Sequence, residues 1–337
     1  MIILNWLSTN LLPSKPDPRL DDYPLMSSWT PTAIISLIYV IGVYAWKVEH
    51  IKRYRNQYKN KEEYNTEMKN SKLSSRSFIK QLMILYNVIM VIYSGVITLG
   101  ILWSVYTLGY GLGCEEQPDP NDTKYDTFVW TGYLFYFSKF VEMLDTVFFL
   151  LRGKVDQVTF LHVFHHATMP PSIWWGVKYA PGGIVFMFPL VNSFIHVIMY
   201  AYYGLAAAEA YRYLWWKNYL TLAQMIQFII LILHQGQIFF LTTPCNYPKV
   251  FPAAIVLYAS VFLVLFSNFY IKAYWHKQRL AKSLAQQQHH HQHQQSQQQQ
   301  NGHFNGKLQS NEYGSTQQIN GYTSSVVNRL KLNKSKD

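Results

Sequence analysis

Long apolar stretches constrain this chain more than any other feature. A helix needs about 20 apolar residues to cross a membrane core of about 30 Å. Seven stretches approach or exceed this length, at 32–46, 78–113, 128–151, 160–177, 184–205, 219–241 and 252–275. The second is too long for one span and too short for two, so we interpret it as one long helix that extends beyond the membrane. The pattern predicts an all-α integral membrane protein with seven transmembrane helices.

Charged residues orient these spans. Only 14% of residues are charged, against about 25% in soluble domains, and the net charge of +11 collects beside the apolar stretches. Segment 47–80 holds ten Lys and Arg and segment 113–126 is acidic, so we expect the first in the cytosol and the second in the lumen. Further basic cytosolic loops contain Arg152, Lys154, Arg212 and Lys217. The N-terminus is then lumenal and the C-terminus cytosolic. Membrane topology accounts for the positive net charge, so nucleic-acid binding is not needed to explain it.

The chain divides into three parts on this basis. We expect a lumenal N-terminal segment at 1–29, a membrane domain at 30–275 and a cytosolic tail at 276–337. The tail is rich in Gln and His, and we interpret it as disordered. Cys114 and Cys245 both fall in predicted lumenal loops, where oxidation is permitted, so we expect a disulfide between them. Asn121 begins a glycosylation sequon in the same lumenal loop as Cys114.

Ionisable residues inside the spans are candidate functional residues, because burying them in a membrane is costly. In the third span, Lys139, Glu142, Asp145 and Thr146 share one broad helical face. This set could be an ion-pair cluster that locks helices together, or part of a reactive site. Both interpretations stay open on these residues alone.

Three histidines begin the fourth span. His162, His165 and His166 lie within one turn of one another, an arrangement that suits metal ligation or nucleophilic and acid–base chemistry better than core packing. In the fifth span, Asn192 and His196 lie one turn apart and can face this cluster. Tyr202 follows on the same span.

The sixth span carries a polar stripe formed by Thr221, Gln224 and Gln227. Such a stripe either bonds to neighbouring helices or lines a polar cavity. A membrane di-iron desaturase or hydroxylase needs several histidine boxes, and this membrane region offers one box plus His196 and His234. We therefore expect no metal and no other cofactor, with a neutral imidazole acting as an acyl acceptor.

Four motifs together resemble the signature of the ELO family of very-long-chain fatty acid elongases, in its animal branch. They are Lys139-x-x-Glu142-x-x-Asp145-Thr146, His162-x-x-His165-His166, Asn192-x-x-x-His196-x-x-Met199-Tyr200 and Thr221-x-x-Gln224-x-x-Gln227. The resemblance implies condensation of long-chain acyl-CoA with malonyl-CoA to 3-ketoacyl-CoA, CoA and CO2. It also implies six of seven helices forming a barrel around an acyl tunnel, and a ping-pong mechanism in which His165 takes the acyl group.

The resemblance also implies roles, partners and location. His162 and His166 would tune the tautomer of His165 or bind the thioester oxygen. His196 and Asn192 would position malonate or stabilise the developing enolate. Glu142 and Asp145 would orient histidines, with Lys139 balancing their charge. Candidate residues for binding CoA or malonyl-CoA are Lys139, Tyr202, Lys217, Gln224, Gln227, Lys272 and Arg279. The enzyme would lie in the endoplasmic reticulum membrane, work with the ketoacyl-CoA reductase, dehydratase and enoyl-CoA reductase of the cycle, and self-associate. A desaturase, and a seven-helix receptor or transporter, remain the alternatives.

Overall fold

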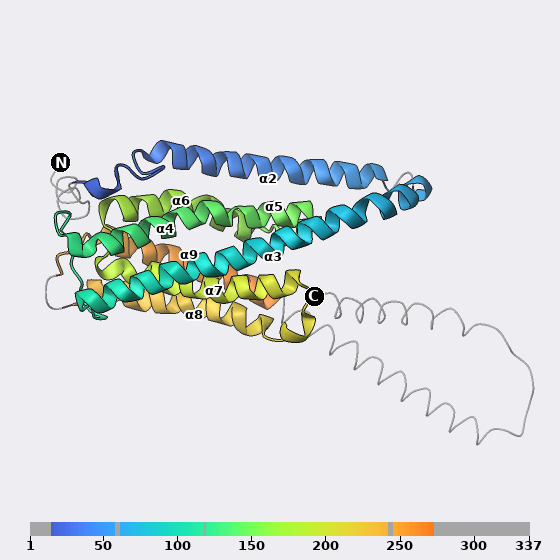
Figure 1. Cartoon of the computed structure of the whole chain (residues 1–337). Coiled ribbons are helices and arrows are strands. Elements are labelled where there is room, and N and C mark those ends of the chain that lie inside the picture. Colours follow the sequence, from blue (N-terminus) through green and yellow to red (C-terminus); the bar gives the residue numbers. More distant parts are fainter. Residues whose placement is uncertain (1–14, 58–60, 118, 242–244, 273–337) are drawn as a thin grey trace, which may run out of the picture. The chain divides into compact units, whose positions relative to one another are not determined.

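The computed structural model describes residues 15–57, 61–117, 119–241 and 245–272, and every regular element in these residues is helical. Figure 1 labels the α-helices, which are α2 (Trp29–Gln57), α3 (Lys61–Leu108), α4 (Asp126–Glu142), α5 (Leu144–Leu151), α6 (Phe160–Tyr179), α7 (Met187–Ala207), α8 (Lys217–Gly236) and α9 (Val250–Tyr270). Short 3-10 helices are η1 (Pro18–Leu20), η2 (Thr123–Tyr125), η3 (Val155–Gln157), η4 (Gly183–Phe186), η5 (Tyr211–Tyr213) and η6 (Gln237–Phe239). The all-helical fold class is as expected. The predicted disordered tail lies outside the described residues.

The second apolar stretch forms one helix, as expected, but its predicted far end is wrong. Helix α3 ends at Leu108, because Gly109 adopts a left-handed φ of 69° and closes the helix. The amide of Tyr110 then donates to the carbonyl of Val105. The residues up to Gly113 therefore do not extend the helix.

The third apolar stretch, expected as one span, is divided at Met143 into α4 and α5. The amide of Met143 donates to the carbonyl of Phe140 at 3.2 Å. This bond joins residues three positions apart, as in a 3-10 turn, and not four apart as in an α-helix. Glu142 and Asp145 lie on either side of this division. The backbone irregularity therefore falls inside the charged motif.

Six of the helices pack in a closed ring. Going round it, the order is α3, α4, α6, α9, α8 and α7, with α7 packing extensively back on α3. The contact between α6 and α9 is the sparsest in this ring. Helix α2 lies outside it and packs against α6, as Figure 1 shows. The ring encloses a core rich in aromatic side chains.

Five helical segments in the described part of the chain are long and apolar enough to cross a membrane. They are Trp29–His50, Ser77–Leu108, Gly183–Ala207, Lys217–Phe239 and Val250–Tyr270. Their outer faces expose large apolar side chains, including Ile38, Leu99 and Val264. Helices α4 to α6 do not reach the same length and hydropathy, because α4 and α5 are short and α6 carries polar residues. The chain is thus a multi-pass membrane protein, and the count of seven spans stays a prediction.

One end of the ring is closed by the α3–α4 and α8–α9 connections, and we call it the capped end. Cys114 and Cys245 form a disulfide between these two connections, with Cα atoms 5.8 Å apart. The Tyr247 hydroxyl donates to the carbonyls of Ala180 and Gly182 at 3.0 and 3.2 Å. Gly183 adopts a φ of 61°, and a Cβ there would lie 2.4 Å from the Tyr247 ring. The disulfide therefore holds the capped end covalently. Position 183 must be glycine, because any side chain there would collide with the Tyr247 ring.

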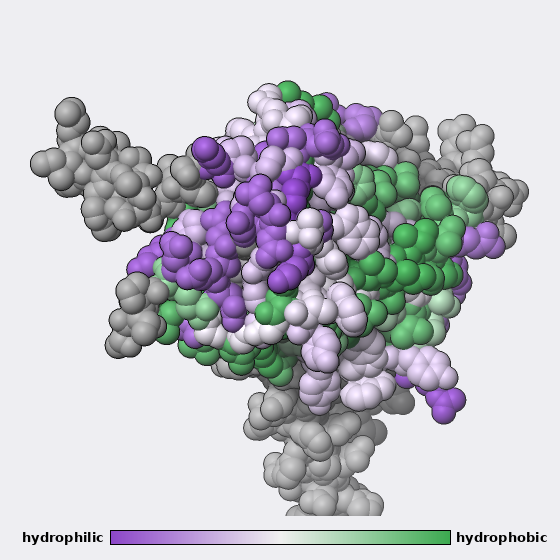
Figure 2. All heavy atoms as spheres, turned by 60° about the vertical axis from the view of Figure 1, so that its left-hand side comes forward, coloured by the Kyte–Doolittle hydropathy of each residue, from purple (hydrophilic) through white to green (hydrophobic). Residues whose placement is uncertain are grey.

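The N-terminal segment packs on the capped end. Leu20 and Met26 are fully buried, and the Trp174 indole donates to the carbonyl of Leu25 at 3.0 Å. Lys178 forms an ion pair with Asp21. Figure 2 shows hydrophilic atoms gathered on this end of the molecule, with hydrophobic atoms covering the flanks. The surface thus separates a polar end from apolar sides, as a membrane-spanning ring requires.

Candidate active site

A buried ion pair lies between α4 and α7. The Lys139 ammonium donates to Glu142 Oε1 at 2.7 Å and to Asn192 Oδ1 at 3.0 Å. Ser138 donates to the same carboxylate oxygen at 2.9 Å. Lys139 and Glu142 are each 2% exposed, so these contacts replace the water that both charges have lost. Lys139 also lies 4.4 Å from the ring centre of Phe135.

His196 extends this cluster and has a defined tautomer. Its Nδ1 lies 2.7 Å from the carbonyl oxygen of Asn192, one turn earlier on α7. Because a carbonyl only accepts, Nδ1 carries a proton. Nε2 lies 3.4 Å from Glu142 Oε2. This contact is an ion pair only when His196 carries a second proton, and Glu142 Oε2 has no hydrogen-bond partner among the described residues.

The histidine box begins α6. The Thr159 hydroxyl caps this helix by accepting from the amide of His162 at 3.3 Å. His162 Nε2 lies 2.8 Å from the Thr146 hydroxyl, which lies 2.8 Å from the Tyr39 hydroxyl. This chain of hydrogen bonds joins α6 to α5 and α2. It fixes the His162 ring and gives Thr146 of the charged motif a partner.

His165 differs from its neighbours. Its Nδ1 is buried and has no hydrogen-bond partner among the described residues. Its ring lies edge-on to Phe262 of α9, with centroids 5.0 Å apart, and to His166 at 5.3 Å. His166 in turn lies 4.5 Å from the His162 ring. His165 is therefore held by ring packing, and its Nδ1 is not tied to another residue.

Asp145 belongs to a separate polar cluster. Its Oδ2 accepts a hydrogen bond from the Tyr200 hydroxyl at 2.8 Å. The Tyr86 ring packs edge-on against Tyr200, and its hydroxyl donates to the carbonyl of Val141 at 3.2 Å. The expected pairing of Asp145 with a histidine has no counterpart among these hydrogen bonds. Asp145 instead joins α5 to α7.

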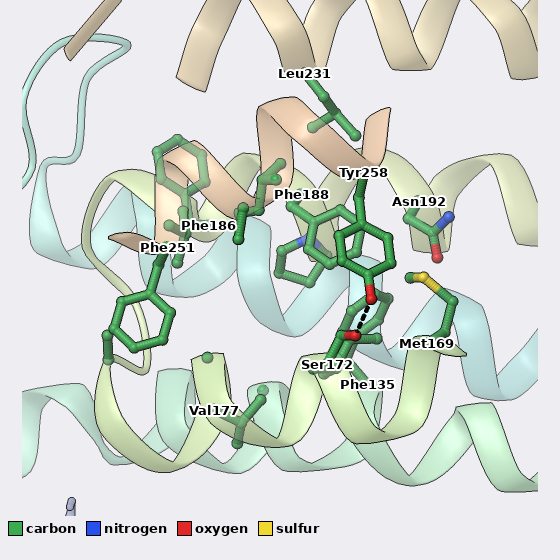
Figure 3. A pocket seen from close by; sticks show the side chains of 18 of the residues that line it. Phe135, Met169, Ser172, Val177, Phe186, Phe188, Asn192, Leu231, Phe251 and Tyr258 are labelled. Atoms are coloured by element: carbon green, nitrogen blue, oxygen red, sulfur yellow. Dashed lines mark hydrogen bonds between the residues drawn. The ribbon is translucent and has the colours of Figure 1, made fainter. Parts of the chain in front are cut away.

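A pocket of about 130 Å³ lies within the ring and begins at His165. Figure 3 shows Asn192 and Met169 at this histidine end, with Val177, Phe186 and Phe251 at the opposite side. Its wall follows α6 from His165 to Gly176 and then the capped end to Gly182. Ala180, at the C-cap of α6, follows His165 by fifteen positions, which corresponds to about 22 Å along the helix axis. Among the histidines of the described residues, only His165 lines this pocket.

The other predicted binding residues do not line the pocket. Lys217 and Lys272 are exposed, whereas Tyr202 is buried and stacks edge-on with Trp216. The Gln224 amide donates to Met199 Sδ at 3.5 Å, so this part of the stripe bonds to a neighbouring helix. Gln227 is buried, and its Oε1 has no hydrogen-bond partner in the part of the chain that the structure describes. Asn121 is exposed, and Arg279 lies outside the described residues.

Sequence reasoning missed several residues that build the site. Ser138 supports Glu142, Phe262 packs on His165, and Ser172 with Tyr258 lines the pocket. The four-residue step from His165 to Met169 and the seven-residue step to Ser172 are helical spacings that could have indicated the shared face. Nothing in the sequence indicates that α9 supplies the opposite wall. No group of three or more His, Cys, Asp or Glu suited to a metal ion occurs in the part of the chain that the structure describes.

Comparison with known proteins gives consistent matches. Residues 24–282 match the ELO family, described as the GNS1/SUR4 family. Very long chain fatty acid elongase 7 of Drosophila melanogaster is 38% identical over 321 residues, which cover 93% of this chain and 87% of the relative. Elongase 7 of Rattus norvegicus is 40% identical over 271 residues, covering 80% and 89%. Elongase 1 of Homo sapiens is 39% identical over 273 residues, covering 80% and 90%.

Proposed function

The chain belongs to the ELO family, and on this premise we propose that it is a fatty acid elongase that condenses long-chain acyl-CoA with malonyl-CoA, with His165 as nucleophile. The relatives are named very long chain fatty acid elongases. One observation carries the choice of nucleophile: among the described histidines, His165 alone lines the apolar pocket. An acyl chain in that pocket would bring its thioester to this imidazole.

The proposed reaction has two transfers. The imidazole of His165 attacks the thioester carbonyl, the carbon–sulfur bond breaks, and CoA leaves as thiolate. Malonyl-CoA then loses CO2, and the electron pair of the broken bond stays on the methylene carbon. That carbon attacks the acyl-imidazole, which forms the new carbon–carbon bond and returns the imidazole. The product is 3-ketoacyl-CoA, and no external oxidant or reductant is required.

The polar cluster would serve the second transfer. When it is protonated at Nε2, His196 could donate toward the negative oxygen that develops when malonyl-CoA decarboxylates. Lys139 pairs with Glu142 and holds the side chain of Asn192, which lines the pocket. His162 and His166 would orient the His165 ring through packing. We propose Asp145 as a positioning residue, because it bonds to Tyr200.

The exposed lysines fit a different task. Lys217 and Lys272 are exposed basic residues near helix ends, where they can attract the phosphates of CoA. Tyr202, Gln224 and Gln227 remain candidates for the CoA or malonyl path. The substrates themselves are acyl-CoA and malonyl-CoA, and the reaction as written needs no metal or other cofactor. A catalytic domain at 30–275 would contain all of these groups.

Family membership also supports the location and the partners. We infer a multi-pass protein of the endoplasmic reticulum membrane with the N-terminus in the lumen and the C-terminus in the cytosol. The Cys114–Cys245 disulfide supports a lumenal capped end, since cytosolic thiols stay reduced. On the same side, the exposed Asn121 is a candidate for glycosylation. The reductases and dehydratase of the elongation cycle would consume the product, and self-association is expected.

The test is malonyl incorporation by the purified protein, with wild type compared with His165→Ala. We expect 3-ketoacyl-CoA from wild type, with or without chelator, and a loss of at least about a thousandfold in His165→Ala. His234→Ala is the matched control, because His234 is a buried histidine that does not line the pocket. Inactive, folded wild type across an acyl-CoA panel would contradict the elongase proposal. Full activity of His165→Ala would leave the reaction standing and remove the proposed nucleophile.

The alternatives are less well supported. The relatives reported above are named very long chain fatty acid elongases, which favours an elongase over a desaturase or hydroxylase. A receptor or transporter is disfavoured by the same matches. Iron-dependent oxidation of an acyl chain by the purified protein would revive the desaturase alternative.

A further inference from the structure

The pocket wall is apolar except at two places. His165 and Asn192 provide polar groups at the histidine end. Ser172 of α6 and Tyr258 of α9 are the remaining polar side chains of the lining, and their hydroxyl oxygens lie 2.5 Å apart. Figure 3 shows this hydrogen bond, which lies partway along the pocket. A plain hydrocarbon chain has no group that could bond to it.

In the hydrogen bond between Ser172 and Tyr258, the tyrosine is the donor. Ser172 lies 2.8 Å from the carbonyl of Thr168, one turn earlier on α6, and donates its only proton to it. The proton between the two hydroxyls therefore comes from Tyr258. The Tyr258 oxygen accepts no hydrogen bond from the described residues, so it keeps acceptor capacity next to the pocket. The group that fits this oxygen is a hydrogen-bond donor.

The place of Ser172 and Tyr258 along the pocket determines which carbon of a bound acyl chain would carry the hydrogen-bond donor. Ser172 follows His165 by seven residues, which correspond to about 10 Å along α6. With carbon–carbon bonds of about 1.5 Å, an extended chain advances about 1.3 Å per carbon. A carbonyl at His165 would therefore put a carbon about eight positions further along the chain beside Ser172 and Tyr258.

We propose that Ser172 and Tyr258 form a subsite for the hydroxyl group of a mid-chain hydroxyacyl-CoA. The inference rests on the proposed function, because it takes His165 as the point where the acyl carbonyl is held. A hydroxyl buried in an apolar tunnel without a partner is strongly disfavoured. Here the substrate hydroxyl donates to Tyr258, which keeps its own bond to Ser172. The enzyme thus accepts both hydroxylated and plain chains.

The same pair could instead act only as a bridge across the ring. Ser172 and Tyr258 join α6 to α9, where the ring contacts are sparsest. A bridge that serves packing alone would affect every substrate equally when it is removed. A subsite affects the hydroxylated substrate selectively, so the ratio of two substrates separates the two roles.

The experiment measures kcat/KM of the purified full-length protein for an unsubstituted long-chain acyl-CoA and for a positional series of hydroxyacyl-CoAs of equal length. In wild type, we expect the derivative hydroxylated about eight carbons from the carbonyl to stay within about threefold of the unsubstituted chain, and other positions to fall further. Tyr258→Phe should lower the ratio of the hydroxylated to the plain substrate about tenfold. Ser172→Ala should lower it about threefold, because Tyr258 then loses its fixed orientation.

Ser260→Ala is the matched control, because this α9 hydroxyl bonds only to the carbonyl of Val256 and does not line the pocket. It should leave the ratio unchanged. Equal losses for both substrates in Tyr258→Phe and Ser172→Ala would overturn the subsite and leave a packing bridge. If wild type elongates the plain chain and rejects every hydroxylated chain, the subsite is wrong and the elongase proposal stands. If wild type elongates neither, the elongase proposal fails and the subsite with it.

Discussion

The two ends of the pocket are stabilised in opposite ways. At the histidine end, Lys139 and Glu142 form a buried ion pair, and the His196 ring lies beside the carboxylate. At the capped end, the wall is apolar. It is fixed by the hydrogen bond from Tyr247 to the carbonyl of Ala180 and by the Cys114–Cys245 disulfide. Polar groups are therefore concentrated at the end where the proposed reaction takes place. Where an acyl chain only has to fit, shape alone suffices.

This difference has an energetic origin. A buried ion pair gains little net stability, because both charges lose their water, but breaking it leaves an uncompensated charge. The histidine end is therefore sensitive to the loss of a single group. An apolar wall responds instead to volume, through cavities or overpacking. The two ends should thus differ in how they respond to substitution.

The largest effect on folding is expected for Glu142→Ala. Removing this carboxylate leaves Lys139 buried without its counter-charge, and the expected loss of unfolding free energy is about 3–5 kcal/mol. Activity should fall together with stability, because His196 also loses its partner. Thermal unfolding in detergent measures the first effect and malonyl incorporation the second. The double variant Lys139→Met with Glu142→Leu should recover part of the stability and none of the activity; full recovery of activity would contradict the role of the pair.

Gly183→Ala tests the capped end by adding one methyl group. The new Cβ would lie 2.4 Å from the Tyr247 ring, at a φ that side chains rarely adopt. We expect a loss of about 1–3 kcal/mol in unfolding free energy, measured as a lower thermal midpoint. Gly42→Ala is the control, since nothing lies within 4 Å of a Cβ at that position. Equal midpoints for the two variants would mean that the cap is not tightly packed.

Val177→Phe should change substrate length more than stability. Val177 is buried and lines the pocket toward the capped end, so a larger ring there shortens the space for the acyl chain. We expect kcat/KM for the longest accepted acyl-CoA to fall about tenfold or more, while shorter substrates change little. Product analysis over an acyl-CoA series measures the shift. A uniform loss across all lengths would indicate that the chain does not reach Val177.

The smallest effect is expected for Lys80→Met. Lys80 and Glu209 form an ion pair at 3.1 Å, but the Lys80 side chain is 38% exposed and the Glu209 side chain 54%. Exposed pairs contribute about 0–1 kcal/mol. The thermal midpoint should therefore barely change, in contrast to Glu142→Ala. A drop as large as that of Glu142→Ala would show that exposure does not distinguish the two pairs.

The sequence predicted the fold class and much of the histidine end, for an identifiable reason. Membrane spans leave few places for charge, so Lys139, Glu142 and His196 could be recognised without coordinates. Helical spacing also put His162, His165 and His166 on neighbouring faces. The disulfide followed from assigning both cysteines to one side of the membrane.

Other features depend on tertiary contacts that spacing cannot give. Met143 divides the third stretch, although both flanks are apolar and helical in pattern. Asp145 bonds to Tyr200 of α7 rather than to a histidine, and its position in the sequence does not indicate this partner. Tyr258 and Phe262 are ordinary aromatic residues in an apolar helix, and only the ring of helices shows that they face His165 and Ser172.

The Cys114–Cys245 disulfide also gives the chain a particular topology. It turns residues 114–245 into a covalent loop that contains α4 to α8, with α2 and α3 on one arm and α9 on the other. Both charged and histidine motifs lie inside the loop, whereas Tyr258 and Phe262 lie on an arm. A single cut in any connection within the loop leaves one covalent molecule, while a cut outside it releases an arm. The groups proposed for the chemistry therefore stay tethered to one another after damage that would separate an uncrosslinked chain.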